Sequence, residues 1–200
     1  MPHTRTDFSN ETTVPAVLGT RQWIFIGSMV ALDFSFGFMF KHILSAIGVS
    51  KIVNLDMAVP VTLMMLTRLV IDRFGVLTAY ELSWAVLAIF GLPNAILPGP
   101  LKLIPAIVQG LVYDLIFSAL RRLPYTRVFA AAILGSLFNK AMVMFLRVWI
   151  LNLPWANITK TLFGLQEALS ILVYALAASL ALTIWKRVEK LQITQLLKVN

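Results

Sequence analysis

Six long apolar runs, separated by short polar or turn-forming segments, dominate the chain. They cover Trp23–Phe40, Ile52–Ile71, Val76–Leu97, Leu103–Leu120, Val128–Leu151 and Leu162–Trp185. A hydrocarbon layer of about 30 Å requires about 20 apolar residues in a helix. In the second run Asp56 and Pro60 leave a short uninterrupted apolar part, and Arg68 is placed to extend toward the interface. The pattern predicts an all-α polytopic membrane protein, a bundle of six transmembrane helices.

Composition favours the same class of protein. Of the 200 residues, 59% are hydrophobic and 13% charged, whereas soluble domains have about 45–50% and about 25%. We expect residues 1–20 to form a disordered cytoplasmic tail, residues 21–190 the transmembrane domain, and residues 191–200 a second cytoplasmic tail. The sequence thus predicts a multi-pass protein of the cell membrane, without room for a soluble catalytic domain.

The basic residues predict the orientation. Lys and Arg are retained in excess on the cytoplasmic side of a membrane. With the N-terminus inside, five cations fall outside: Lys41, Lys51, Lys102, Arg147 and Lys160. Lys140 lies within the fifth run, and eleven fall inside: Arg5, Arg21, Arg68, Arg73, Arg121, Arg122, Arg127, Lys186, Arg187, Lys190 and Lys198. This asymmetry favours both termini in the cytoplasm, an N-in/C-in topology, and explains the net charge of +8 without a nucleic-acid partner.

The fourth run contains polar residues where lipid-facing ones are expected. Lys102, Gln109 and Tyr113 are seven and four residues apart and share one helical face, and Asp114 follows Tyr113. Ionisable groups are costly in hydrocarbon and usually face the protein interior or a wet cavity. We therefore expect this helix to line a binding site.

Two further runs have polar stripes at a similar depth. In the fifth, Ser136, Lys140 and Arg147 share a face, and in the sixth Glu167, Ser170 and Tyr174 do the same; these are six residues in all. Three stripes at matching depth predict a cavity that opens outward and holds a small polar molecule. The alternative is structural: Lys140 neutralises Asp114 or Glu167 in a buried pair, and Arg147 and Glu167 extend to the interface.

Small residues recur every four positions in the first run, at Gly27, Ala31 and Ser35. Such a face lets another helix approach closely, either within the bundle or from a partner subunit. In the third run Glu81 and Trp84 would suit a cationic ligand, but the orientation places them in the cytoplasmic half.

Motifs for catalysis are missing from the sequence. Cysteine is absent and there are only two histidines, so the sequence predicts no metal site and no thiol chemistry. There is also no phosphate-binding glycine loop and no nucleophile motif. We predict a protein that is not an enzyme and has no cofactor.

Residues 21–190 resemble the substrate-binding S component of energy-coupling factor (ECF) transporters. The resemblance rests on six apolar runs in about 200 residues, the small residues of the first run, the Pro98–Lys102 entry into the fourth run, and the motif Gln109–Asp114. It implies a subunit that binds a vitamin-like solute from outside and docks on a transmembrane T component driven by cytoplasmic ATPases. The family docks through two alanines four apart in the first span, but here Gly27 and Ser35 flank a single alanine, Ala31. In the family the last three spans and outer loops hold the ligand.

Other functions remain open at this stage. Asp114, Lys140 and Glu167 could instead relay ions in a stand-alone secondary transporter or small channel, or the charges could serve only assembly with partner helices. The ligand's charge is also open. Lys102, Lys140 and Arg147 favour a carboxylate or phosphate, whereas Glu167, Asp114 and the Glu81–Trp84 pair favour a cationic heterocycle.

Overall fold

The computed structural model describes residues 18–46, 55–91, 97, 99–152, 154, 165–191, 194 and 197. All regular structure in these residues is helical, which confirms the predicted all-α class. Residues 1–17 and most of the predicted C-terminal tail lie outside the described residues, so both tails stay predictions.

A helix occupies each of the six apolar runs. The helices are α1 (Thr20–Ala46), α2 (Ala58–Val70) preceded by the 3-10 turn η2 (Leu55–Met57), α3 (Val76–Gly91), and α4 (Leu103–Ala119) preceded by the 3-10 turn η3 (Gly99–Lys102). They continue with α5 (Pro124–Ala130), the π-helical turn η4 (Ala131–Gly135), α6 (Ser136–Leu151) and α8 (Leu165–Val188). The fifth run is therefore a long helix that a π turn interrupts.

Three of these helices are long and apolar enough to cross a membrane: Gly99–Ala119, Pro124–Ile150 and Glu167–Val188. Helix α3 is a shorter apolar helix of 16 residues. Helix α2 has 13 residues, about 20 Å at 1.5 Å per residue, which is less than the hydrocarbon thickness of about 30 Å. Pro60 falls in its first turn, where a missing backbone N–H costs little.

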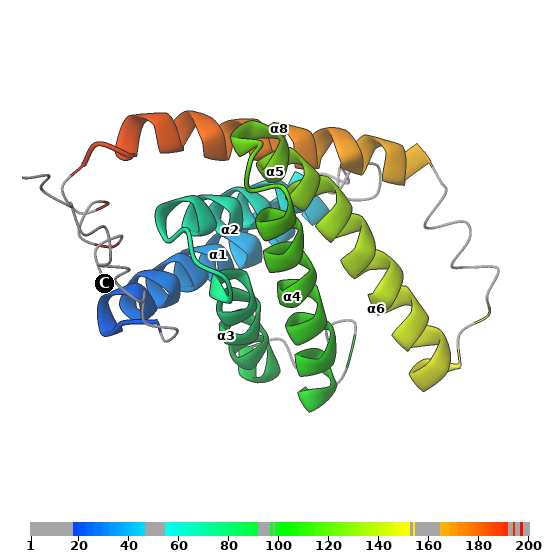
Figure 1. Ribbon diagram of the computed structural model, residues 1–200. Coiled ribbons are helices and arrows are strands. Elements are labelled where there is room, and N and C mark those ends of the chain that lie inside the picture. Colours follow the sequence, from blue (N-terminus) through cyan, green and yellow to red (C-terminus); the bar gives the residue numbers. More distant parts are fainter. Residues whose placement is uncertain are drawn as a thin grey trace, which may run out of the picture.

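The helices fall into two groups that cross each other (Figure 1). Helices α1, α2 and α8 run across the view, and α3, α4 and α6 run downward from them. The predicted bundle of six membrane-crossing helices and its orientation stay predictions.

Large apolar side chains cover the outside of the long helices. On α8, Leu172, Leu176, Leu180 and Ile184 repeat every four residues, and their exposed fractions lie between 38% and 62%. Helix α4 has a matching row at Ile104, Ile107, Leu111 and Leu115. Contiguous exposed apolar surface of this kind marks contact with lipid or another protein.

Small residues and glycine sit where helices approach closely. Ala177, Ala178 and Ala181 of α8 are fully buried, and Thr62 of α2 donates a hydrogen bond to the Ala177 carbonyl at 3.3 Å. On α4, a Cβ added at Gly110 would collide with the backbone of Thr78 in α3. Close backbone approach through small residues is a main source of helix association in lipid, so this packing fits a membrane interior.

Candidate functional site

Asp114 joins α4 to the beginning of α3. Its side chain is fully buried and accepts hydrogen bonds from the backbone N–H groups of Leu77 (3.4 Å) and Thr78 (3.0 Å) and from the Thr78 hydroxyl (2.9 Å). The first N–H groups of a helix have no partner within it, and a carboxylate there also complements the helix dipole. Asp114 therefore caps α3 and does not contact Lys140.

Lys102 binds the other end of the same helix. Its ammonium group is buried and donates a hydrogen bond to the Ala88 carbonyl at 2.9 Å. Ala88 lies in the last turn of α3, where carbonyl groups have no helical partner and positive charge is favourable. Antiparallel α4 thus places an anion at the start of α3 and a cation at its end. The structure gives these two predicted ligand residues a shared structural role.

A second set of charges extends from Asp114. Arg68 of α2 is 3% exposed, so its side chain is enclosed by protein, and its predicted position near the interface stays a prediction. Its guanidinium group pairs with Asp114 at 3.4 Å and with Asp72 at 2.9 Å, and Arg127 of α5 pairs with Asp72 at 3.2 Å. The Phe117 ring lies 5.2 and 5.1 Å from the two guanidinium carbons. The charges of two arginines and two aspartates thus cancel, and these residues connect α2, the turn after it, α4 and α5.

A neighbouring face of α4, next to that of Asp114, carries a neutral hydrogen-bond chain. The Tyr113 hydroxyl lies 2.9 Å from the Ser136 hydroxyl of α6, and Gln109 donates to Tyr113 at 3.4 Å. All three side chains are buried. The Tyr113 ring packs against Gly135, the last residue of π turn η4, at a point where any Cβ would collide with it. π turns inside α-helices occur frequently at functional sites.

Lys140 lies one helical turn beyond Ser136 and forms an ion pair with Glu167 of α8. The structure therefore selects Glu167 rather than Asp114 as its partner. Glu167 is 4% exposed, and among the described residues its carboxylate oxygens have no hydrogen-bond partner apart from the ion pair with Lys140. Further along α8, Tyr174 hydrogen-bonds to Ser170. Arg147 lies half-buried two turns beyond Lys140, and within the described residues its Nε is buried without a hydrogen bond.

Acidic residues between α1 and α3 were not assigned to the site from sequence. Asp33 is 3% exposed and accepts a hydrogen bond from the Tyr80 hydroxyl at 2.8 Å, while its Oδ1 has no partner among the described groups. Glu81 follows Tyr80 on α3 and is half-buried. Its predicted place in the cytoplasmic half stays a prediction.

The small-residue face of α1 points outward. Gly27, Ala31 and Ser35 are all exposed, and a Cβ at Gly27 would meet nothing within 4 Å. The buried positions of α1 lie on another face and include Ile26 and Val30. Within the described residues, this favours the docking interpretation over an internal contact.

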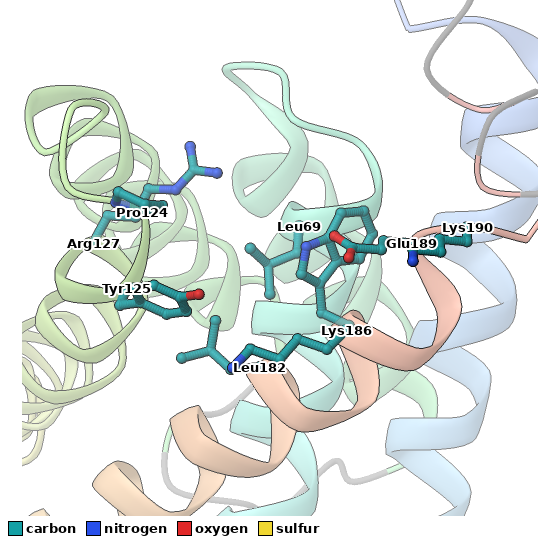
Figure 2. A pocket seen from close by; sticks show the side chains of 9 residues that line it. Leu69, Pro124, Tyr125, Arg127, Leu182, Lys186, Glu189 and Lys190 are labelled. Carbon is teal, nitrogen blue, oxygen red and sulfur yellow. The ribbon is translucent and has the colours of Figure 1, made fainter.

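A pocket of about 460 Å³ lies between α5 and α8, with Leu69 of α2 in its lining (Figure 2). Of the site residues described above, only Arg127 is among those that line it. The described residues contain no group of three or more potential metal ligands. Comparison of the chain with known protein families, curated proteins and solved structures finds no match. We therefore base the functional proposal on the site's own residues.

Proposed function

We propose that this chain is the substrate-capture subunit of an ECF-type uptake transporter of the cell membrane. In this proposal, six membrane-crossing helices with cytoplasmic termini enclose a site for a small, polar, vitamin-like solute. A transmembrane T component and its ATPases drive release of the solute. The hydrogen bond from Gln22 at the start of α1 to the Leu197 carbonyl, at 2.9 Å, supports termini on one side of the membrane.

The observation that carries the proposal is the polar interior shared by α4, α6 and α8. Gln109, Tyr113 and Ser136 form a buried hydrogen-bond chain, and the Lys140–Glu167 ion pair lies next to it along α6. Polar groups inside a helix bundle that faces lipid mark substrate or ion pathways. Among the described residues only Lys140 pairs with Glu167, which leaves acceptor capacity that a solute would use.

The residues left in the site narrow the solute class. Of the charged residues predicted for the site from sequence, Lys102 and Asp114 cap α3, which leaves Lys140, Arg147 and Glu167, two cations against one carboxylate. This balance favours an acidic or zwitterionic solute over a purely cationic heterocycle. Tyr113 and Tyr174 would supply hydroxyl groups and ring faces beside it.

The outward face of α1 would dock the T component. Gly27, Ala31 and Ser35 leave room for a partner helix, and the Ser35 hydroxyl is already satisfied by the Ala31 carbonyl at 2.8 Å. A face without unsatisfied polar groups can meet lipid before docking and another helix afterwards.

A stand-alone, ion-coupled transporter is the second candidate. Buried Asp33, with one unpartnered oxygen, and its neighbour Glu81 favour it, since buried carboxylates in membrane proteins commonly relay protons or cations. Uptake that needs no partner subunit and stops with an uncoupler would establish this candidate instead.

One experiment separates these functions. Solute binding is first identified by native mass spectrometry of the purified protein, and uptake of that solute is then measured in cells with and without the partner subunits. Lys140→Ala should weaken binding about tenfold or more, because it removes a charge-assisted contact, and uptake should fall with it. Ala31→Trp should keep binding and lose uptake.

The matched control for the docking face is Leu32→Trp, an exposed neighbour outside the row of small residues. It should retain both binding and uptake. A folded Lys140→Ala variant with unchanged affinity would remove Lys140 from the site. Loss of binding together with uptake in Ala31→Trp would show that the α1 face serves internal packing.

A further inference from the structure

The groove between α5 and α8 combines features of a membrane interface. Tyr125 of α5 and Trp185 of α8 line it, together with Leu182 and Leu69 (Figure 2). Tyr and Trp concentrate where hydrocarbon meets headgroups, since their rings are apolar and their polar atoms can reach water. The groove thus has an apolar floor and an aromatic rim.

The charged residues of the groove differ in whether an opposite charge already pairs with them. Arg127 lines the groove but pairs with Asp72, within the balanced set around Arg68 and Asp114. Among the described lining residues, Lys186 at the end of α8 and Lys190 just beyond it stand beside one carboxylate, Glu189, which leaves one positive charge in excess. The Lys186 ammonium group stands 5.3 Å from the Tyr125 ring centroid, so it bridges the two walls of the groove.

Exposed cations continue around the same end of the molecule. Arg121 and Arg122 stand on the turn before α5, and Arg187 follows Lys186 on α8. The exposed apolar row of α8, which includes Leu180 and Ile184 (52% and 38% exposed), faces away from the groove, because Leu182 and Lys186 lie on the other side of the helix. Cations thus surround a groove whose apolar surface is its own floor.

We propose that this groove binds the phosphate-bearing headgroup of an anionic phospholipid, with the acyl chains lying against its apolar floor at Leu69 and Leu182. Basic pockets between membrane helices bind acidic headgroups, and each nearby cation adds to the attraction. A free phosphate would share the headgroup chemistry, but it would make no use of the adjoining apolar surface. The inference rests on the membrane location in the proposed function and does not depend on the solute site.

Native mass spectrometry of the full chain in a neutral detergent provides the test. Phosphatidylglycerol is titrated against phosphatidylcholine, and inorganic phosphate is added as competitor. Phosphatidylglycerol should bind about tenfold tighter than phosphatidylcholine, and equimolar phosphate should not displace it. Lys186→Gln should weaken phosphatidylglycerol binding about fivefold, the effect expected for one cation near an anionic lipid.

The adjacent residue supplies a matched control. Arg187→Gln removes the same charge from the same helix turn, but Arg187 does not line the groove. The affinity of this variant for phosphatidylglycerol should therefore stay within twofold of that of the unchanged protein. Lys190→Gln provides a second groove variant that leaves the Lys186–Tyr125 contact intact, and it should also weaken binding.

Equal losses in Lys186→Gln and Arg187→Gln would show diffuse surface attraction and overturn the groove. Absence of preference for phosphatidylglycerol, or its displacement by phosphate, would also overturn the proposal. Lys140 lies outside the groove, so the Lys140→Ala variant should keep its preference for phosphatidylglycerol. If the protein binds this lipid selectively but binds no solute, only the proposed function is contradicted.

Discussion

Two buried charge groups in this protein differ in how completely they are satisfied. Asp114 is fully buried, accepts three hydrogen bonds and pairs with Arg68. Glu167 is almost as buried, yet it has one ion pair, with Lys140, and no hydrogen bond from the described residues. Both carboxylates lie in apolar helices, so burial alone does not distinguish their roles.

The difference shows which of the two carboxylates is satisfied by the described part of the fold. A buried ion pair offsets its desolvation only when further hydrogen bonds satisfy the remaining lone pairs. Asp114 meets this condition because the N-terminus of α3 supplies two backbone donors. Among the described residues, Glu167 has no donor besides Lys140, which is why the proposed function places the solute beside Glu167.

Loss of the Asp114 carboxylate should have the largest effect. Asp114→Ala leaves the buried Arg68 without one partner and uncaps α3, and removal of one member of a buried pair costs about 3–5 kcal/mol. We expect a large drop in unfolding temperature in detergent. The thermal unfolding curve of purified protein measures it directly.

Asp72→Asn is the control for that variant. The Asp72 side chain is 43% exposed, and solvent screens its pairs with Arg68 and Arg127, so it should cost about 1 kcal/mol or less. If the Asp114→Ala variant is as stable as the unchanged protein but does not bind solute, Asp114 belongs to the ligand site and does not serve mainly to stabilise the fold.

The ion pair of α6 and α8 should respond differently to paired replacement. Glu167→Met alone leaves Lys140 unpaired and should destabilise the protein by up to about 3–5 kcal/mol. Adding Lys140→Met should recover that loss, because apolar replacements of buried ion pairs are often neutral or stabilising. Solute binding should be lost in the single variant and should not return in the double variant. Recovery of stability together with solute binding would assign the pair to structure alone.

Hydrophobic periodicity was sufficient to predict the helices. Each apolar run contains one helix, and the boundaries of α4 match the prediction to within one residue. The shortness of α2 was visible in the interruption at Asp56 and Pro60. The crossing of the two helix groups was not, because periodicity reports which face of a helix is buried and not its direction in space.

Polar residues were located from the sequence, but their partners were not. Lys102 and Gln109 share a face of α4, yet one caps α3 and the other faces α6. Helical spacing fixes a side chain's angle around its own axis, whereas the choice of partner depends on neighbouring helices. One signal was readable: Arg68 and Asp72 are four residues apart, the spacing of an ion pair on one helix.

The smallest effect should come from the neutral chain beside the ion pair. Tyr113→Phe removes the hydroxyl that joins Gln109 and Ser136 but keeps the ring that packs on Gly135. A hydrogen bond contributes about 1 kcal/mol to stability, so the loss should be of that order. Tyr125→Phe, at a tyrosine that is 57% exposed, is the control and should leave thermal unfolding unchanged.

If the Tyr113 hydroxyl also contacts solute, the free energy of solute binding should fall by more than the free energy of unfolding, because buried partner groups are then left unpaired in the complex. Equal, small losses in both measurements would show that the Tyr113 hydroxyl only joins α4 to α6.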